Sequence, residues 1–489
     1  NGTPIGGIQM DDVNGDGLID LIKAHQGSSS NGVYLNEGVG EGWVLSTTWS
    51  NPLFFQDNYF IDTGVRLADA NGDGLADLIE ARKEQSSTIR KVWINNGVDD
   101  WEYDDTWTIP IDFSNVGSDT GVRLTDINGD GLLDLIKSNS YSSSTNGVYL
   151  NSGEKSWVLD TAWSIPVSFY TDDGDNGVRL TDANGDGLID LLQQVKESST
   201  STINKLYVNN GGGWEHDSSW SIPANFSNIF SYNNSVGLGD VNGDGLIDVF
   251  QSLQQGTTFT DDVYIATGEK ADLLSTIHNS DGAETNITYK GSAEYKDGSG
   301  NLLNSSLPLI VQTVSSTEVT DSFGTDITTN YTYAKGKYYF NSQLDRKFSG
   351  FGKVTQTDDA GTVTTMSFHG GTQNESSLGQ YQDHISKIGK PYRIEVKDNS
   401  GNIFSKTINK WDKADLSSSR YFVKLAQSVD YTYDGNTSHK DKATAYTYSD
   451  TTGNTSTITN WGQVTGSDDG TFSDTGSDKF TTTLTYASG

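Results

Sequence analysis

The chain lacks cysteine and is poor in proline and in basic side chains. Its 489 residues include no cysteines, seven prolines and 32 lysines and arginines, against 65 aspartates and glutamates. Without cysteine there is no disulfide and no thiol nucleophile, and redox chemistry does not indicate a compartment. No stretch approaches the roughly 20 apolar residues of a membrane-spanning helix. The net charge of −33 makes nucleic acid and anionic membranes poor partners.

Sequence motifs of enzymes are also missing. No histidine falls in an H-E-x-x-H or a Ser/His/Asp pattern, so we expect a non-catalytic protein whose histidines are surface or turn residues. The six histidines are His25, His216, His278, His369, His384 and His439.

The two ends of the sequence predict a fragment or a processed product. There is no initiator methionine and no signal peptide, and the last residues form a strand-like run. The missing signal therefore says nothing about secretion.

Glycine is abundant, at 54 residues, and threonine, tyrosine and valine recur throughout. Long apolar runs with a 3.6-residue period are absent, whereas short alternating runs are bounded by Asn-Gly and Asp-Gly turns. This composition predicts an all-β protein, long enough for two or three domains.

A nine-residue phrase, D-x-N-G-D-G-x-x-D, occurs five times in the first half. The copies begin at Asp12, Asp69, Asp126, Asp182 and Asp240, at intervals of 57, 57, 56 and 58 residues. Alternate residues of a tight loop point inward, so the side-chain oxygens at positions 1, 3, 5 and 9 can converge, with the carbonyl of position 7 as a further ligand. A hard cation that wants six to eight oxygens fits this set, and calcium fits better than magnesium.

The phrase therefore predicts about five calcium sites. The candidate ligands are Asp12, Asn14, Asp16, Leu18, Asp20, Asp69, Asn71, Asp73, Leu75, Asp77, Asp126, Asn128, Asp130, Leu132, Asp134, Asp182, Asn184, Asp186, Leu188, Asp190, Asp240, Asn242, Asp244, Leu246 and Asp248. The two glycines of each copy allow the backbone to curl around the ion.

The loops differ from EF-hands. Position 12, where an EF-hand needs a bidentate glutamate, holds lysine or glutamine in four of the five copies. The flanking segments also read as strands rather than helices. A polar hairpin turn without an ion is the alternative, and five copies with aspartate at positions 1, 5 and 9 favour calcium over it.

Four tryptophan pairs, each six residues apart, lie between the loops. They account for eight of the eleven tryptophans and are Trp43/Trp49, Trp101/Trp107, Trp157/Trp163 and Trp214/Trp220. One repeat reads as strand, loop, strand, strand and tryptophan-containing strand, the size of a propeller blade, whereas a β-solenoid would have a shorter period. We expect these tryptophans to pack between blades rather than to form a ligand-stacking platform.

The repeats resemble the FG-GAP/VCBS family, whose members are calcium-binding β-propellers. We expect a propeller over residues 1–268, in which five repeats are recognisable. Residues 1–270 carry 40 acidic and 13 basic side chains, a net charge of −27, and the remainder carries −6. Fifteen of the acids are loop aspartates, so part of the acidity reflects ion binding rather than a partner.

The second half, residues 269–489, has a different sequence pattern. It consists of alternating Thr/Tyr/Val/Ser strands joined by tight turns, for example residues 328–333, 362–369 and 392–397. We expect an extended antiparallel sheet.

Several segments of this half resemble SpvB-type proteins and Tc toxin B subunits. Residues 345–354, Asp-Arg-Lys-Phe-Ser-Gly-Phe-Gly-Lys-Val, are similar to the R-x-F-x-G-F-G-x-V signature, and residues 389–393 with 398–401 resemble the next block. Residues 446–454, and less well 431–436, resemble YD repeats of the Rhs family. Arg346, Phe348 and Phe351 could form a partner site, although aromatic packing around a close backbone approach is favoured.

This resemblance implies a propeller followed by the first strips of a hollow Rhs-like β-shell that encloses a toxic polypeptide. In that family the propeller docks on a translocation subunit. The chain departs from the family in stopping before most YD repeats and in lacking an autoprotease region and a toxin domain.

Two functions from different classes follow. The first is a non-catalytic structural and docking part of a secreted or surface-exposed Rhs/Tc-toxin-like bacterial protein, with a translocation subunit as protein partner and an enclosed polypeptide as cargo. The second is a calcium-dependent lectin or adhesin module, because exposed tryptophan stacks on carbohydrate.

Overall fold

The computed structural model describes residues 7–37, 42–140, 145–172, 174–196, 201–228, 236–255, 258–267, 270, 273–321, 323–342, 345–371, 375–417, 420–433, 437–449 and 451–487. These residues form strands and three short 3-10 helices, which confirms the all-β prediction. They contain no helix long and apolar enough to cross a membrane. Two compact units are formed by residues 1–273 with 341–345 and by 274–340 with 346–489, and each is described by itself.

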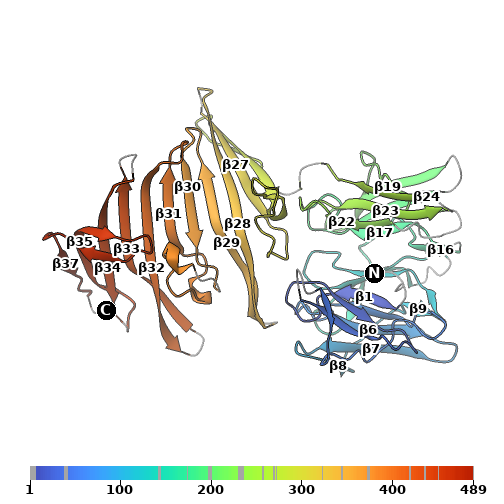
Figure 1. Cartoon of the computed structure of the whole chain (residues 1–489). Coiled ribbons are helices and arrows are strands. Elements are labelled where there is room, and N and C mark those ends of the chain that lie inside the picture. Colours follow the sequence, from blue (N-terminus) through green and yellow to red (C-terminus); the bar gives the residue numbers. More distant parts are fainter. Residues whose placement is uncertain are drawn as a thin grey trace. The chain divides into compact units, whose positions relative to one another are not determined.

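The first unit is a five-bladed β-propeller (Figure 1). The strands of its blades, in order, are β1 (Ile8–Asp11), β2 (Asp20–Lys23), β3 (Gly32–Asn36) and β4 (Trp43–Leu45); β5 (Val65–Ala68), β6 (Asp77–Lys83), β7 (Thr88–Asn95) and β8 (Trp101–Asp104); β11 (Val122–Thr125), β12 (Asp134–Lys137), β13 (Gly147–Asn151) and β14 (Trp157–Asp160); β17 (Val178–Thr181), β18 (Asp190–Lys196), β19 (Thr202–Asn209) and β20 (Trp214–Asp217); and β22 (Val236–Gly239), β23 (Asp248–Gln255) and β24 (Thr258–Tyr264).

Each blade is an antiparallel meander in which sequential strands pair. The D-x-N-G-D-G-x-x-D loop joins the first and second strands, and the first tryptophan of each pair begins the fourth strand in blades 1 to 4. The predicted order of strand, loop, strand, strand and tryptophan strand is therefore confirmed. Short strands accompany the links between blades: β9 (Ser114–Asn115), β10 (Ser118–Asp119), β15 (Tyr170–Thr171), β16 (Gly174–Asp175) and β21 (Ser227–Asn228).

The core of the propeller consists of layers between consecutive blades. In the second strand of a blade, adjacent apolar residues face opposite sides of the blade, as the two-residue period of a strand requires. Leu78 thus packs with blade 1 and its neighbour Ile79 with blade 3. Leu191 and Leu192 divide in the same way between blades 3 and 5. In blades 2, 3 and 4, the two apolar residues that follow the last aspartate of the loop therefore join the blade to both of its neighbours.

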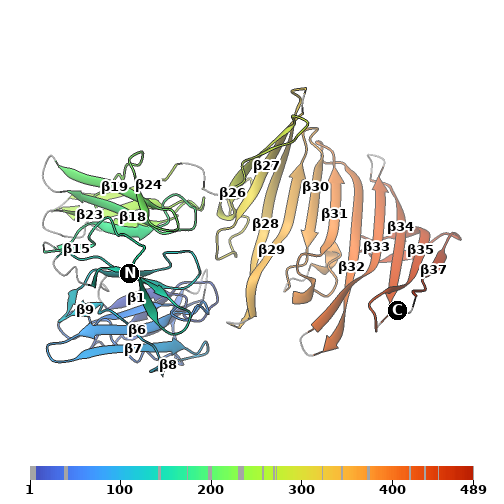
Figure 2. The same cartoon turned by 180° about the vertical axis from the view of Figure 1, so that it is seen from behind.

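The second unit is one large antiparallel sheet, whose strands lie side by side in Figures 1 and 2. Its strands are β25 (Thr276–His278), β26 (Glu284–Gly291), β27 (Gln312–Thr320), β28 (Asp326–Ser342), β29 (Asp345–Thr357), β30 (Val363–Phe368), β31 (Pro391–Lys397), β32 (Ile403–Ser417), β33 (Arg420–Tyr433), β34 (His439–Tyr448), β35 (Thr455–Gly466), β36 (Phe472–Asp474) and β37 (Phe480–Thr483). The 3-10 helices are η2 (Ser292–Glu294), η3 (Ser376–Leu378) and η4 (Ile385–Lys387). The extended antiparallel sheet is confirmed.

The Gly-Phe-Gly block lies in β29. Phe351 stacks against Phe348 and Tyr333, with ring centroids 5.4 and 4.9 Å apart. A Cβ on Gly336 would lie 3.2 Å from the Phe351 ring, so the close backbone approach occurs at Gly336. Aromatic packing is confirmed for the two phenylalanines. Residues 434–436 and Asp450 of the YD-like segments lie outside the described residues.

Candidate metal-binding loops of the propeller

The five loops share one backbone conformation. In the first, Gly15 and Gly17 have φ values of 76° and 88°, in the left-handed region that disfavours side chains. Positions 4 and 6 of the other loops fall in the same region. The expected conformational role of the glycines is confirmed.

Hydrogen bonds to the first aspartate close each loop. Asp12 Oδ1 accepts from the N–H of Gly15 at 2.7 Å, and Oδ2 accepts from that of Gly17 at 2.8 Å. The side-chain amide of Asn14 donates to Asp16 Oδ2 at 3.0 Å. Positions 1, 3 and 5 are thus brought together, with their oxygens engaged by N–H groups of the loop.

The last aspartate of the loop, at position 9, lies at the start of the second strand of the blade. We call it the closing aspartate. Asp20 begins β2 and is fully buried, and its oxygens accept from the N–H groups of Val13 at 3.0 Å and Asn36 at 2.7 Å. Asp77, Asp134, Asp190 and Asp248 are equally buried. This aspartate therefore ties the loop to the third strand of its own blade.

Burial is the main cause that raises the pKa of four position-9 aspartates, namely Asp20, Asp77, Asp134 and Asp190. The other loop aspartates raise it further, whereas N–H hydrogen bonds lower it. The pKa is about 7 for Asp20, about 8 for Asp77 and about 6 for both Asp134 and Asp190. Buried, mutually repelling carboxylates are groups that a bound cation would stabilise in their charged form.

The donor chemistry of the loops fits a hard cation, since each combines carboxylate, amide and carbonyl oxygens. Within the described residues, however, no three Asp, Glu or His side chains are grouped as a formed metal centre. Ligation by these residues stays a prediction.

The leucines at position 7 have a packing role that the sequence did not suggest. A Cβ on Gly72 of blade 2 would lie 2.6 Å from the side chain of Leu132 of blade 3. Gly129 and Leu188 repeat this contact between blades 3 and 4 at 3.0 Å. Neighbouring loops therefore touch, and the position-4 glycine leaves room for the leucine.

An asparagine at the end of the third strand in blades 2, 3 and 4 is a residue that the sequence reasoning missed. Asn95 donates through Nδ2 to the carbonyl of Val13 at 2.9 Å, and Asn151 to that of Ala70 at 2.8 Å. Each acceptor is position 2 of the loop in the preceding blade. The recurrence of Asn-Gly or Asn-x-Gly after the third strand is the signal that could have identified them.

The sequence Gly-Val-Arg-Leu precedes the loops of blades 2, 3 and 4, and its arginine forms an ion pair. Arg66 and Asp62 are buried and lie 2.8 Å apart. Arg123 pairs with Asp119 at 3.1 Å and lies 6.0 Å from the ring of Phe169. The pair fixes the entry into the first strand of the blade.

The tryptophans form contacts between blades, as expected. The ring centroids of Trp49 and Trp101 are 4.8 Å apart, those of Trp107 and Trp157 5.1 Å, and those of Trp163 and Trp214 4.9 Å. The second tryptophan of one pair thus meets the first tryptophan of the next. The outermost members, Trp43 and Trp220, are 51% and 37% exposed.

The prediction of surface or turn positions for the histidines is wrong for His369. It is fully buried beside Asp383, with Nδ1 2.8 Å from a carboxylate oxygen. Its ring also packs on Tyr392, at 5.4 Å. Backbone hydrogen bonds join His369 to Gly389 and Lys390, so residues 375–391 return to the end of β30, and this contact could not be read from local sequence.

Two family models match the chain. The FG-GAP-like repeat matches residues 12–80 and 126–192, and the model described as insecticide toxin TcdB middle/N-terminal region matches residues 221–374. A curated relative, the T-cell immunomodulatory protein homolog of Plasmodium yoelii yoelii, is 24% identical over 259 residues, which are 50% of this chain and 34% of that protein.

Solved Tc toxin structures share the fold. The Photorhabdus luminescens Tc holotoxin pore matches 94% of this chain and 26% of its own, with a TM-score of 0.62 and 17% identity. TcdB2-TccC3 without its hypervariable C-terminal region and TcdB2-TccC3-Cdc42 match over the same shares, with TM-scores of 0.57 and 0.55 and identities of 17% and 16%. The chain thus spans about a quarter to a third of the length of these proteins. It joins FG-GAP-like repeats and a segment of the TcdB middle/N-terminal type on the fold of the TcdB2-containing Tc toxin structures.

Proposed function

We propose that the chain is a non-catalytic structural part of a secreted Tc-toxin-like protein, in which a calcium-stabilised propeller caps a β-shell that encloses a polypeptide. The observation that supports it best is the match to a Tc toxin structure over 94% of the chain, which includes the propeller and the large sheet together. The similarity to Tc toxin proteins supports a structural toxin component; the capping, the cargo and the calcium are the proposal.

The exposure of several strands of the sheet supports the proposal that the sheet forms part of an enclosing shell. In a two-layered domain one face of each strand is buried in a core. All six residues of β30 are instead half-buried, and β35 is half-buried over its first eight residues. We take these half-buried strands as the lining of a space. Other parts of the sheet, in β32 to β35, share a buried cluster of Ile408, Val429, Tyr431, Ala443 and Val464.

A structural role agrees with the environment of the buried histidine. His369 is 0% exposed and Asp383 is nearly as buried, so substrate has no access to this pair. We assign it to fixing the segment that follows β30.

The loops would hold calcium through the aspartates and asparagines at positions 1, 3, 5 and 9 and the carbonyls at position 7. A cation would neutralise carboxylates of adjacent loops that are in contact around the propeller. Its role would be to stiffen the blades, with no part in a reaction.

The lectin reading is not favoured. It required exposed tryptophan faces, but six of the eight paired tryptophans are stacked on one another between blades. Docking on a translocation subunit, as in the Tc toxin family, remains our proposal for the partner.

Electron cryomicroscopy of the complete gene product tests the proposed architecture. We expect a hollow shell with the propeller at one end and weak, unordered density inside. A solid domain beside the propeller would contradict the shell. Mass photometry of a mixture with a Tc toxin translocation subunit would test docking separately.

A further inference from the structure

The contact between tryptophans of successive blades is incomplete after blade 4. Trp107 is the second tryptophan of blade 2, and it stacks on Trp157, which begins the fourth strand of blade 3 and is 3% exposed. Trp220 is the corresponding residue of blade 4, but no aromatic ring stacks on it among the described residues. It is 37% exposed.

Among the described residues, blade 5 has no fourth strand that would supply the partner ring. In the described part of the chain its sheet ends at β24, which pairs with β23 alone. In blade 4, Asn209 of the third strand lies opposite Trp214 of the fourth. The residue equivalent to Asn209 is Ala266, whose N–H donates to Asp248 Oδ1 as that of Asn209 does to Asp190 Oδ1.

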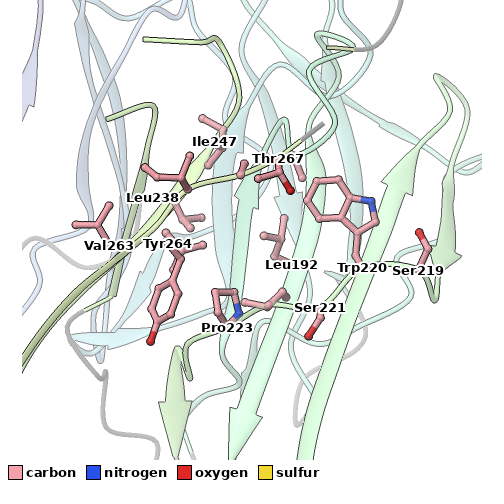
Figure 3. Close-up of a pocket in the computed structure, with 15 residues that line it drawn as sticks. Leu192, Ser219, Trp220, Ser221, Pro223, Leu238, Ile247, Val263, Tyr264 and Thr267 are labelled. Carbon is pink, nitrogen blue, oxygen red and sulfur yellow. The ribbon is translucent and has the colours of Figure 1, made fainter. Parts of the chain in front are cut away.

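A groove of about 750 Å³ occupies the place of the missing tryptophan (Figure 3). Between blades 2 and 3, Trp157 shares one apolar layer with Ala70, Trp107, Ile109 and Leu133. The residues at the same repeat positions all line the groove: Ala183, Trp220, Ile222 and Ile247. The groove therefore has the walls of a tryptophan site.

The repeats also supply the polar anchor of that site. Trp43, Trp101, Trp157 and Trp214 each donate through Nε1 to the carbonyl of position 8 of their own blade's loop, at 2.7–3.2 Å. The corresponding carbonyl in blade 5 belongs to Ile247, a residue of the groove.

A second tryptophan without a stacking partner among the described residues lies in blade 1, at the other end of the row of blades. Trp43 begins the fourth strand of blade 1 and is 51% exposed, since no preceding blade supplies a second tryptophan. Phe250 of blade 5, the counterpart of the buried Ile79, is 40% exposed. The four tryptophan pairs of this chain have the pattern W-x5-W. A single added strand with this pattern would offer one ring to Trp220 and one to Trp43.

The occupant can be described by its charge as well. β7 of blade 2 carries Arg90 and Lys91, whereas the matching positions of β24 are Asp261 and Asp262, both exposed. Arg90 pairs with Asp112 in the segment after the fourth strand, at 2.9 Å. Because the charge of β24 is reversed, a basic side chain in the added segment would complement it.

We propose that the edge of blade 5 binds an extended strand of a partner protein, with an aromatic residue opposite Ala266, a second aromatic six residues later and at least one basic residue between or beside them. The described part of this chain supplies no such strand, because its four W-x5-W segments already build blades 1 to 4 and its other tryptophans lie in β7, β32 and β35. The binding mode is addition of a strand to a sheet edge. It is independent of calcium and of shell formation.

The probe is a labelled peptide with the sequence of residues 155–166, in which Lys replaces Asp160. Fluorescence anisotropy with the intact protein should show saturable binding. A peptide with both tryptophans changed to alanine should bind at least tenfold more weakly, and so should the original peptide to Trp220→Ala. Since Trp220 is partly exposed, this variant should keep its far-UV circular dichroism. Asp261→Lys with Asp262→Lys should weaken binding of this peptide and favour the unchanged sequence.

Three outcomes would overturn the proposal: no binding at about 1 mM peptide, equal binding of the alanine peptide, or binding that Trp220→Ala leaves unchanged. Dimerisation in sedimentation, abolished by Trp220→Ala, would assign the groove to a second copy. Failure of the complete gene product to bind the peptide, where this chain does bind it, would assign the groove to a flanking segment of the same polypeptide.

Discussion

The side-chain amide of Asn209 in blade 4 donates a hydrogen bond to the carbonyl of Ile127 in the loop of blade 3, over 2.8 Å. The backbone N–H of Asn209 donates to Asp190, the closing aspartate of its own loop. One buried residue thus connects two candidate metal-binding loops. Blade 5 has Ala266 at this position and lacks the connection.

Asn209→Ala should therefore destabilise the propeller. It removes a buried donor and leaves the carbonyl of Ile127 without it, at a cost of about 1–3 kcal/mol. Urea unfolding followed by tryptophan fluorescence measures the loss. The exposed neighbour provides the control: Asn210→Ala should change stability by less than about 0.5 kcal/mol. Equal effects of the two substitutions would count against the coupling.

Removal of calcium should lower the melting temperature of the propeller. A site at ten times its dissociation constant adds about 1.4 kcal/mol, provided that the unfolded chain does not bind. Scanning calorimetry with calcium and with EDTA should show a large shift of the propeller transition. Asp130→Ala should reduce this shift by about one site's share, whereas the exposed Asp105→Ala should not. A melting curve that EDTA leaves unchanged would remove calcium from the loops.

Trp157→Ala should cost about 3–5 kcal/mol, the range for a buried aromatic side chain. Trp43→Ala removes the same side chain in the same strand position, but it is half exposed and stacks on no second tryptophan among the described residues, so its cost should be well under half as large. Chemical denaturation of both variants tests this. A cost for Trp43→Ala that matches that of Trp157→Ala would indicate that the contact between blades contributes little.

The ion pair of Lys155 and Asp104 should give a pH-dependent contribution. The hydrogen bond from Lys155 is the main cause that lowers the pKa of Asp104 to about 2. A folded-state pKa below the unfolded value stabilises the fold above the unfolded pKa, and this stabilisation is lost as the pH falls towards 2.

Lys155→Met should thus cost roughly 0.2–1 kcal/mol at pH 7, the range for exposed pairs. The difference from the unchanged protein should shrink as the pH is lowered from about 5 to 2.5. Denaturant unfolding at several pH values measures it, and Lys205→Met, on another exposed strand position, should show no such trend. A cost that stays constant with pH would contradict the assignment.

The repeats made the blades predictable, because strand periodicity and loop spacing are local properties. The stacking of tryptophans between blades also followed, since each blade must cover an apolar face. The asparagine bridges did not follow, because an isolated Asn-Gly reads as a turn and its partner lies about 80 residues away. Nor did the burial of His369, which depends on a segment that returns over β30.

Blade 5 also combines features that the sequence predicts with features that it does not. Its loop was recognised from sequence, and the missing tryptophan pair was visible there as well. That the gap would be a groove with the walls of a tryptophan site required the three-dimensional register of Trp220, Ile247 and Ala266.

The apolar layers shared by consecutive blades have a consequence for unfolding. Each apolar cluster of the described propeller residues spans two consecutive blades, so stability is a sum of nearest-neighbour terms along the series. Blade 5 shares a described layer with blade 4 alone. Hydrogen exchange should accordingly find the lowest opening free energies in β22–β24 and rising protection toward the central blades. The propeller would unravel from its last blade, and a strand bound there would slow exchange in blades that it does not touch.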